Sequence, residues 1–352
     1  MLAAVYNGAD RLQLVERPTP AIGPDEALLR VGACGVCGTD LRILASGHRR
    51  IPAGAERILG HELAGEIAAV GAQVRSLQPG QRVALAPNIG CGACDLCVRG
   101  FTQLCPDYTS FGVVIDGGFA EYMRIPAPAI AQGNVVPIAD GLSDEEAALA
   151  EPLSCCFHGL TACRLAPGED VLVFGAGPIG ILHLLLARAL GARRVIAADI
   201  SPERLARVPA GLADAQLDPG DPAFPGAVAA LTDRKGVDVA IVAAPSAEAQ
   251  AQAIGLMNVH GRVNFFGGLP ASMAGPTLDS NRVHYRELTL TGTTGQTVAE
   301  YRTCLSLMAS RRIDVRPLVT DRFGLRGIEA AISSARARGG LKTLVLPRAE
   351  PA

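Results

Sequence analysis

The segment VLVFGAGPIGILHLLLARALGARRVIAAD, residues 171–199, constrains the fold of this 352-residue chain more than any other stretch. An apolar strand leads into a loop with three glycines, an apolar helix follows, and a second apolar strand ends at Asp199. Strand-like and helix-like segments continue to alternate as far as GRVNFFG at 261–267. This alternation predicts an α/β fold with a doubly wound parallel sheet.

The three glycines have the spacing Gly175-x-Gly177-x-x-Gly180. The first suits a tight turn, the second lets a ligand approach the backbone, and the third permits close packing of helix on strand. The start of the following helix offers free N–H groups and a positive dipole end to phosphates. With Pro178 and Ile179, these glycines are therefore candidate contacts of a dinucleotide. The alternative is a glycine-tolerant turn without a ligand.

Asp199 ends the second strand, nineteen residues beyond Gly180. A carboxylate at this place accepts hydrogen bonds from an adenosine ribose and repels a 2′-phosphate, so NAD is expected rather than NADP. Arg204 follows on the next predicted helix, and an arginine there can also attract a 2′-phosphate. We expect the acid to dominate because it lies at the strand end itself.

The first third of the chain reads differently, as short strands separated by turn residues, which predicts a small β-barrel. A helix is expected to begin near Ser143, because Glu146 follows three residues later in a capping-box pattern. The predicted domains are a barrel-type catalytic domain at 1–147, a dinucleotide-binding domain at 148–290, and a return to the first domain at 291–352.

Four cysteines lie within fifteen positions in CGACDLCVRGFTQLC, namely Cys91, Cys94, Cys97 and Cys105. This spacing lets one loop, about residues 88–106, surround a single Zn²⁺ with four thiolates. Such a site has no open position and is expected to be structural. An iron–sulfur cluster, a nucleic-acid zinc ribbon and four unrelated buried cysteines are the alternatives. A ribbon is disfavoured because Arg99 is the only basic residue inside the loop.

A second group combines Cys37 in CGVCGTD, His61 and Glu62 in GHE, and Glu151 in AEPLSCC. A thiolate, an imidazole and exchangeable carboxylates suit a catalytic zinc ion with an open position. Each residue has an ordinary structural alternative, and Cys34 with Cys37 could instead be a redox pair.

The composition and charge of the chain bear on its binding partners and on its location in the cell. The net charge is −2 with both signs interspersed, which gives no electrostatic signature of nucleic acid or membrane binding. The N-terminus lacks the pattern of a signal peptide, and no apolar run approaches the length of a membrane span. A cytoplasmic protein is therefore expected, where clustered cysteines are more often metal ligands than disulfides.

Taken together, GVCGTD, GHE, the four-cysteine loop, DGGFAEY, AEPLSC and GAGPIG resemble the zinc-dependent medium-chain dehydrogenase/reductase family over essentially the whole chain. The resemblance implies a GroES-like barrel joined to a Rossmann domain, with one catalytic and one structural zinc ion and NAD as cofactor. The Glu-Pro pair at 151–152 resembles the sorbitol (iditol) and threonine dehydrogenase branch. By this likeness Cys37, His61 and either Glu62 or Glu151 hold the catalytic zinc.

The family likeness also implies roles for the residues after the cysteine ligand. Thr39 would relay the substrate proton, and Asp40 would orient His61. Relatives often place a histidine five residues after the ligand cysteine, where this chain has Arg42. Because arginine does not exchange protons near neutral pH, His48, a water chain or solvent would have to complete the relay.

The expected activity is oxidation of a secondary alcohol, a polyol or a cyclic polyhydroxy compound, to a ketone with NAD. A threonine 3-dehydrogenase-like enzyme is the alternative, and a non-catalytic, zinc-stabilised NAD-binding module is the alternative of another class. If the arginines of RILASGHRR at 42–50 face the substrate, a phosphorylated or carboxylated compound becomes plausible. The resemblance implies a homo-oligomer, a dimer or a tetramer, with a small-molecule partner and neither nucleic acid nor membrane.

Overall fold

The computed structural model describes residues 1–8, 10–270 and 272–349, and the chain forms two compact units. The first unit comprises residues 1–154 together with the segment from Gln296 onward, and the second comprises Cys155–Gly295. The second unit is thus one continuous stretch inserted between two segments of the first.

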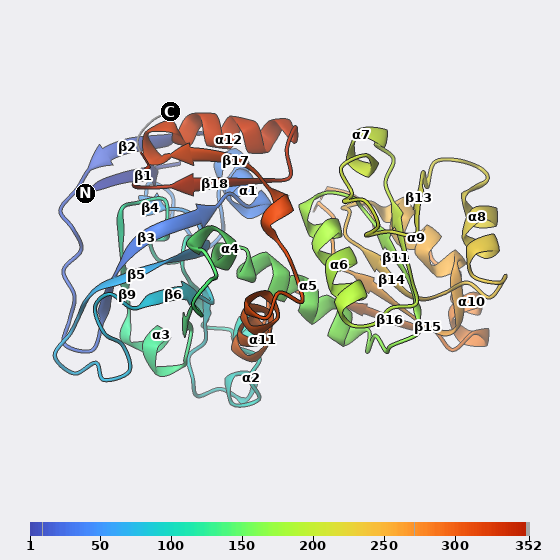
Figure 1. The fold of residues 1–352 in the computed structure, drawn as a ribbon, viewed down its shortest axis with the longest axis horizontal. Helices are drawn as coiled ribbons and strands as arrows, with labels where there is room; N and C mark the ends of the chain where they lie inside the picture. Colours follow the sequence, from blue (N-terminus) through green and yellow to red (C-terminus); the bar gives the residue numbers. More distant parts are fainter. Residues whose placement is uncertain (9, 271, 350–352) are drawn as a thin grey trace. The chain divides into compact units, whose positions relative to one another are not determined.

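The elements of the first unit come from both of its segments (Figure 1). In chain order they are β1 (Leu2–Tyr6), β2 (Leu12–Glu16), β3 (Ala27–Gly35), α1 (Gly38–Ser46), β4 (Arg57–Ile58), β5 (Glu62–Val70), β6 (Arg82–Leu85), β7 (Asn88–Ile89), α2 (Asp95–Val98), η1 (Thr102–Leu104), β8 (Thr109–Ser110), β9 (Tyr122–Ile125), α3 (Ala127–Ala131), β10 (Val135–Pro137), α4 (Asp144–Ala148), the start of α5 (Ala150–Ala162), α11 (Val298–Ala309), η2 (Arg316–Leu318), β17 (Val319–Gly324), η3 (Leu325–Gly327), α12 (Ile328–Ala337) and β18 (Lys342–Leu346).

Strand β3 is the centre of the first unit. Its first six residues alternate between buried and half-buried positions, as expected for a strand with one face on a core, and its last three are all buried. It pairs with β5 on one edge, and with β9 and β18 on the other, within a seven-stranded sheet. Strands β17 and β18 run parallel and are connected through α12, which packs on both of them. The C-terminal segment therefore completes the sheet that the N-terminal segment begins (Figure 1).

The second unit consists of a parallel sheet and its connecting helices. Its elements are β11 (Asp170–Phe174), α6 (Pro178–Ala189), β12 (Arg194–Ala198), α7 (Pro202–Leu205), β13 (Ala215–Leu217), α8 (Phe224–Leu231), β14 (Val237–Val242), α9 (Ala247–Gly255), β15 (Met257–Phe265), α10 (Ser280–Tyr285) and β16 (Thr289–Gly292). The strand order is β13-β12-β11-β14-β15-β16, and every pairing is parallel.

Strand β11 lies in the middle of this sheet, between β12 and β14. All five of its residues are buried, which is the pattern of a strand covered on both faces rather than on one. The chain passes from β11 to β12 on one side and later to β14 on the other, so the order of the strands reverses at β11. In doubly wound sheets the crevice at this reversal, beyond the carboxyl ends of the strands, is where ligands bind.

The capping box at the start of α4 forms. The Ser143 hydroxyl accepts a hydrogen bond from the Glu146 N–H at 3.1 Å, and the Glu146 carboxylate accepts one from the Ser143 N–H at 2.9 Å. The helix nevertheless ends at Ala148, and α5 begins at Ala150. Pro152 has no N–H to donate to the Ala148 carbonyl, which accounts for the interruption of the helical ladder.

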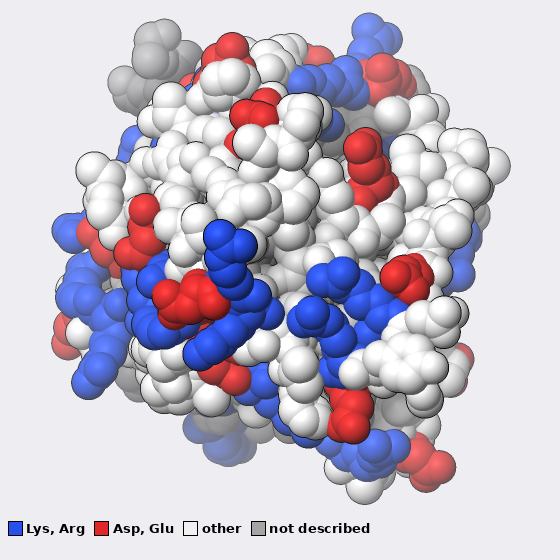
Figure 2. Space-filling model, turned by 90° about the vertical axis from the view of Figure 1, so that its right-hand side faces the viewer, with Lys and Arg blue, Asp and Glu red and all other residues white. Residues whose placement is uncertain are grey.

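Charges of both signs share the surface of the molecule. On the face in Figure 2, clusters of basic side chains lie next to acidic ones. Among the residues that the structure describes, no helix is both long enough and apolar enough to cross a membrane.

We predict that the core of the second unit is sensitive to truncation at Ile196, which is fully buried on β12. Ile196→Ala should lower the free energy of unfolding by about 2–5 kcal/mol through lost burial and a residual cavity. Ile200, four residues later, is 75% exposed and provides the matched control. Denaturant titration without cofactor measures both variants, and equal losses for the two would contradict this description of the core.

Candidate active site

The four clustered cysteines converge in space. Their sulfur atoms all lie within 4.8 Å of one another, with 3.9 Å between Cys91 and Cys97 and 3.8 Å between Cys94 and Cys105. The short elements β7, α2, η1 and β8 carry the chain around this point. Four thiolates bound tetrahedrally to zinc at about 2.3 Å would be separated by about 3.8 Å, so the cluster has the dimensions of a closed Zn²⁺ site.

The thiols of the cluster differ in acidity when no metal neutralises them. Hydrogen bonds from the backbone N–H groups of Ala93 and Cys94 lower the pKa of the exposed Cys91 thiol to about 6. Desolvation raises the pKa of Cys97 to about 12. The cluster therefore offers a ready thiolate at neutral pH, while Cys97 would lose its proton on metal binding.

The mixed cluster is assembled from two separate places in the first unit. Cys37 precedes α1 as its N-cap, His61 lies immediately before β5, and Glu62 is the first residue of β5. One ligand atom from each lies within 4.8 Å of the others. His61 and Glu62 are buried, and Cys37 is half-buried. A thiolate, an imidazole and a carboxylate at this spacing form a donor set that suits zinc.

Asp40 lies behind this cluster and is fully buried. Its carboxylate accepts hydrogen bonds from the backbone N–H groups of Cys37 at 2.8 Å and Gly60 at 3.3 Å, and it lies 3.5 Å from His61 Nδ1. Burial works against a charged imidazole, but the negative charges of Asp40 and Cys37 outweigh burial and raise the pKa of His61 well above its usual value. The arrangement places a carboxylate where it can orient the ring of a ligating histidine.

Glu62 has an interaction partner that the sequence did not indicate. Its carboxylate oxygen Oε2 contacts the ammonium of Lys342, the first residue of β18. Lys342 is 6% exposed, and Glu62 is fully buried. Burial disfavours the charged lysine, yet the negative charges of Glu62 and Cys37 raise the pKa of Lys342. The salt bridge between Glu62 and Lys342 is thus enclosed in the interior of the first unit.

Glu151 occupies a different position from the other predicted ligands. It lies in the first turn of α5 and is 7% exposed, but it is not a member of the group formed by Cys37, His61 and Glu62. Its charge contributes to raising the pKa values of Lys342 and of the buried Tyr301 hydroxyl, so it acts on the same region of the first unit.

The arginines after α1 already have partners in the protein. Arg42 donates a hydrogen bond to the Thr39 hydroxyl at 3.1 Å. Arg50 donates to the carbonyl of Pro106 at 2.7 Å and to that of Tyr108, and its guanidinium lies 4.1 Å from the centroid of the Tyr108 ring. Arg50 thus fastens the loop after α1 to the segment that follows the four-cysteine cluster.

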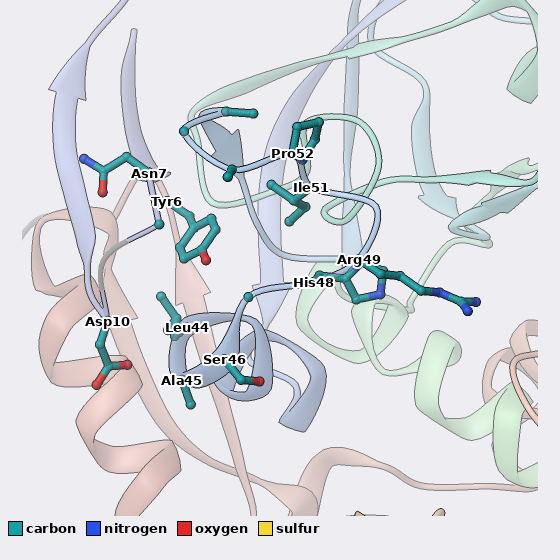
Figure 3. A pocket seen from close by; sticks show the side chains of 15 residues that line it. Tyr6, Asn7, Asp10, Leu44, Ala45, Ser46, His48, Arg49, Ile51 and Pro52 are labelled. Atoms are coloured by element: carbon teal, nitrogen blue, oxygen red, sulfur yellow. The ribbon is translucent and has the colours of Figure 1, made fainter. Parts of the chain in front are cut away.

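A surface cavity of about 810 Å³ lies on the other side of the same loop (Figure 3). It is lined by Tyr6 and Asn7 at the end of β1 and by residues 44–49 and 51–55, and the Arg49 side chain points away from Tyr6. His48 belongs to this lining, whereas no residue of the mixed cluster does. Burial and the nearby arginines lower the pKa of His48, so its ring is neutral at pH 7.

The glycine loop of the second unit has the geometry expected of its sequence. Gly175 follows β11 with φ of +103°, and a Cβ atom at Gly180 would lie 1.7 Å from the Gly175 carbonyl oxygen. The space beside Gly177, the N-cap of α6, is open. Pro178 is the first helical residue, where its missing N–H leaves no hydrogen bond unmade. Ile179 follows it in the same turn. This turn leaves partly accessible residues and a helix N-terminus available to a phosphate.

Asp199 links the end of β12 to this loop. Its two carboxylate oxygens accept hydrogen bonds from the N–H groups of Ala176 at 2.8 Å and Ser201 at 2.9 Å. The Arg204 guanidinium lies 3.6 Å from Asp199 Oδ2. The acid and the arginine that were predicted to compete over a 2′-phosphate therefore form an ion pair, and the acid also holds the glycine loop in place.

Two family models match the chain. Residues 23–138 match the alcohol dehydrogenase GroES-like domain, and residues 178–310 match the zinc-binding dehydrogenase domain. Together they include the mixed cluster, the four-cysteine cluster and most of the parallel sheet.

Proteins of similar sequence and structure extend the match to nearly the whole chain. The L-threonine 3-dehydrogenase of Rhizobium johnstonii is 33% identical, with 93% of each chain covered. The sorbitol dehydrogenase of Bacillus subtilis is also 33% identical, over 95% of this chain and 93% of that protein. The crystal structure of a zinc-binding dehydrogenase of Sinorhizobium meliloti bound to NADP has 32% identity and a TM-score of 0.89, covering 98% and 99% of the two chains. The chain belongs to the zinc-binding alcohol dehydrogenase family, so the predicted family and α/β fold class are confirmed.

Two contacts near the site were not predicted from the sequence, that of Lys342 with Glu62 and that of Arg50 with the chain after the cysteine cluster. Lys342 had a detectable signal, because it is the one charged residue in the mostly apolar segment LKTLVLP and one of only two lysines among 32 basic residues. Arg50 had none, since its partners are backbone carbonyls more than fifty residues away.

We predict two zinc ions per chain, one for each cluster. Elemental analysis of protein purified without chelator should find one fewer ion in Cys37→Ala, which remains folded. Cys94→Ser should lose the other ion and, with it, part of the stability of the lobe. Cys163→Ala, a buried cysteine outside both clusters, is the control. A wild-type protein with one ion or none would contradict the prediction.

Proposed function

We propose that the protein is a zinc- and NAD-dependent oxidoreductase that converts a secondary alcohol to a ketone. The observation that carries this proposal is the mixed Cys37–His61–Glu62 cluster in a chain that also has the Gly175–Gly180 loop. The first can hold a Lewis-acidic metal, and the second can hold a dinucleotide. A metal site and a hydride acceptor together are what oxidation of an alcohol requires.

Each site residue of the first unit would have a distinct role in this reaction. Zinc, when bound, supplies Lewis acidity, which makes an alcohol hydroxyl easier to deprotonate. Cys37 and His61 would hold the ion, with Asp40 fixing the orientation of the His61 ring from 3.5 Å. Glu62 and Glu151 would provide the exchangeable carboxylates that free a position for substrate. Oxidation takes a proton from the hydroxyl, and a hydride from the adjoining carbon passes to the nicotinamide.

Thr39 would receive the hydroxyl proton. Because Arg42 donates to the Thr39 oxygen, the Thr39 O–H is left to point elsewhere, and Arg42 itself stays protonated. The proton would therefore leave through water. His48 is neutral and could accept a proton, but it lines the separate cavity beside α1.

A polyol or a cyclic polyhydroxy compound is the proposed substrate. Likeness to a sorbitol dehydrogenase over most of the chain supports it, and likeness to a threonine 3-dehydrogenase makes threonine the second candidate. Arg42 and Arg50 give little support to a phosphorylated substrate, since their guanidinium groups already contact protein oxygen atoms.

NAD is proposed as the preferred form of the cofactor because the Asp199 carboxylate lies nearly buried at the strand end, where the ribose of a dinucleotide is expected. The likeness to a structure bound to NADP makes this preference worth testing. A cytoplasmic location, suggested by the thiol-rich zinc lobe, and a homo-oligomeric state, suggested by the family, belong to the same proposal.

Cofactor preference tests the role of Asp199. The wild type should show a higher kcat/KM with NAD than with NADP by at least about tenfold, because the carboxylate repels a 2′-phosphate. Asp199→Asn removes the charge while keeping an oxygen that can accept from Ala176, and it should reduce the ratio. Comparable kcat/KM values for both cofactors in the wild type would exclude the preference.

A steady-state screen with NAD tests the substrate class. It compares sorbitol, galactitol, inositols, their phosphates, threonine and simple primary alcohols, and growth of the NADH absorbance reports turnover. A polyol should give the highest kcat/KM. If primary aliphatic alcohols exceed every polyol by about tenfold or more, the substrate assignment is wrong. If NADH forms with no alcohol, although zinc and NAD are bound, a non-catalytic binding module is the better description.

A further inference from the structure

A lysine inside a candidate metal site is unusual. Lysines are almost never fully buried unless they are paired, and this chain has only two of them. Lys235 is exposed on the second unit, whereas Lys342 is buried against Glu62. A positive charge beside a metal cation opposes binding of that cation, so the position of Lys342 calls for a reason other than metal affinity.

The side chains of Lys342 and Glu62 contact each other beside a single glycine, Gly35. Gly35, the last residue of β3, lies opposite Glu62 on β5, while β18 pairs with β3 on its other edge. A Cβ atom at Gly35 would lie 2.1 Å from Glu62 Oε2 and 3.0 Å from the Cε atom of Lys342. The two side chains therefore meet over bare backbone, where any larger residue would separate them.

The two oxygen atoms of Glu62 are in different situations. Oε2 contacts the Lys342 ammonium, while Oε1 is buried without a hydrogen-bond partner among the residues that the structure describes. A buried carboxylate oxygen without a partner is unfavourable unless a cation or a donor reaches it. Oε1 is thus the atom that Glu62 can offer to a metal held by Cys37 and His61.

We propose that Lys342 is a positioning residue that weakens the hold of Glu62 on the catalytic metal. This inference rests on the proposed function, because it assumes a metal at the mixed cluster. By binding Oε2 and neutralising part of the carboxylate charge, Lys342 limits Glu62 to a single, weakened contact. Glu62 can then leave the metal and return to it, so that a coordination position opens for the substrate.

The direction in which zinc affinity changes when Lys342 is neutralised distinguishes a positioning role for this lysine from a purely structural one. Lys342→Met keeps the length of the side chain and removes the ammonium, so Glu62 loses its lysine partner and can offer both oxygen atoms to the metal. The variant should hold its catalytic zinc about tenfold more tightly than the wild type, and kcat should fall because the position no longer opens. A structural lysine predicts the opposite, a loosened site that loses zinc.

The experiment measures zinc release to a chromogenic chelator from wild type, Lys342→Met, Lys342→Arg and Lys235→Met. We expect slower release of one of the two ions only in Lys342→Met, a return toward the wild-type rate in Lys342→Arg, and no change in the exposed-lysine control. In the Co²⁺-substituted protein, the visible absorption of the mixed site should change in Lys342→Met, because Glu62 enters the coordination shell. Unchanged or faster release with an unchanged spectrum overturns the proposal.

Two outcomes distinguish a failure of this proposal from a failure of the proposed function. If the wild type binds no metal at the mixed cluster, the function itself is wrong. If the wild type binds two ions and turns over alcohol, but Lys342→Met releases zinc as fast as the wild type or faster, only the role of Lys342 is wrong. Lys342→Gln carries the same expectation if the methionine variant does not fold. Failure of both neutral variants to fold with zinc supplied makes Lys342 structural and overturns the proposal.

Discussion

The first unit depends on pairing the ionisable side chains that it buries in its interior. Asp40 faces His61, and Glu62 faces Lys342, so each carboxylate has a cationic or protonatable partner. Removing one member of such a pair leaves the other uncompensated, at a free-energy cost larger than that of losing a surface ion pair. Glu62 lies on β5 and Lys342 on β18, so this pair connects the two strands that flank β3, in addition to the apolar core.

The two cysteine-containing clusters differ in how they are made. The four-cysteine cluster is local, because its thiols lie within fifteen residues and every ligand is of one kind. The mixed cluster joins Cys37, before α1, to the adjacent His61 and Glu62 at the start of β5, and it uses groups of three different chemistries. A local, uniform cluster is suited to holding an ion permanently, whereas a mixed set that includes a carboxylate is suited to exchanging a ligand. This difference in construction agrees with one structural and one reactive site.

Much of the fold and of the candidate site could be predicted because the signals are local. The glycine loop, the strand that ends at Asp199 and the cysteine spacing each lie within a short window, so their geometry follows from a single turn or loop. The partner of Glu62 could not be predicted in this way, because Lys342 is 280 positions away and reaches Glu62 only through the pairing of β18 with β3. Nor could the sequence distinguish Glu62 from Glu151, since both are acids beside a motif and only their three-dimensional positions separate them.

The insertion of the second unit into the first has a consequence for biosynthesis. Residues 155–295 leave the ribosome as one continuous stretch, so the parallel sheet can form while the chain is still growing. Until β18 is synthesised, part of one edge of β3 has no strand to pair with, and Glu62 lacks the ammonium group of Lys342. The contact between Glu62 and Lys342 is thus made late in the synthesis of each chain. A chain cut short before β18 would contain all strands of the parallel sheet, whereas its Glu62 would lack the lysine partner.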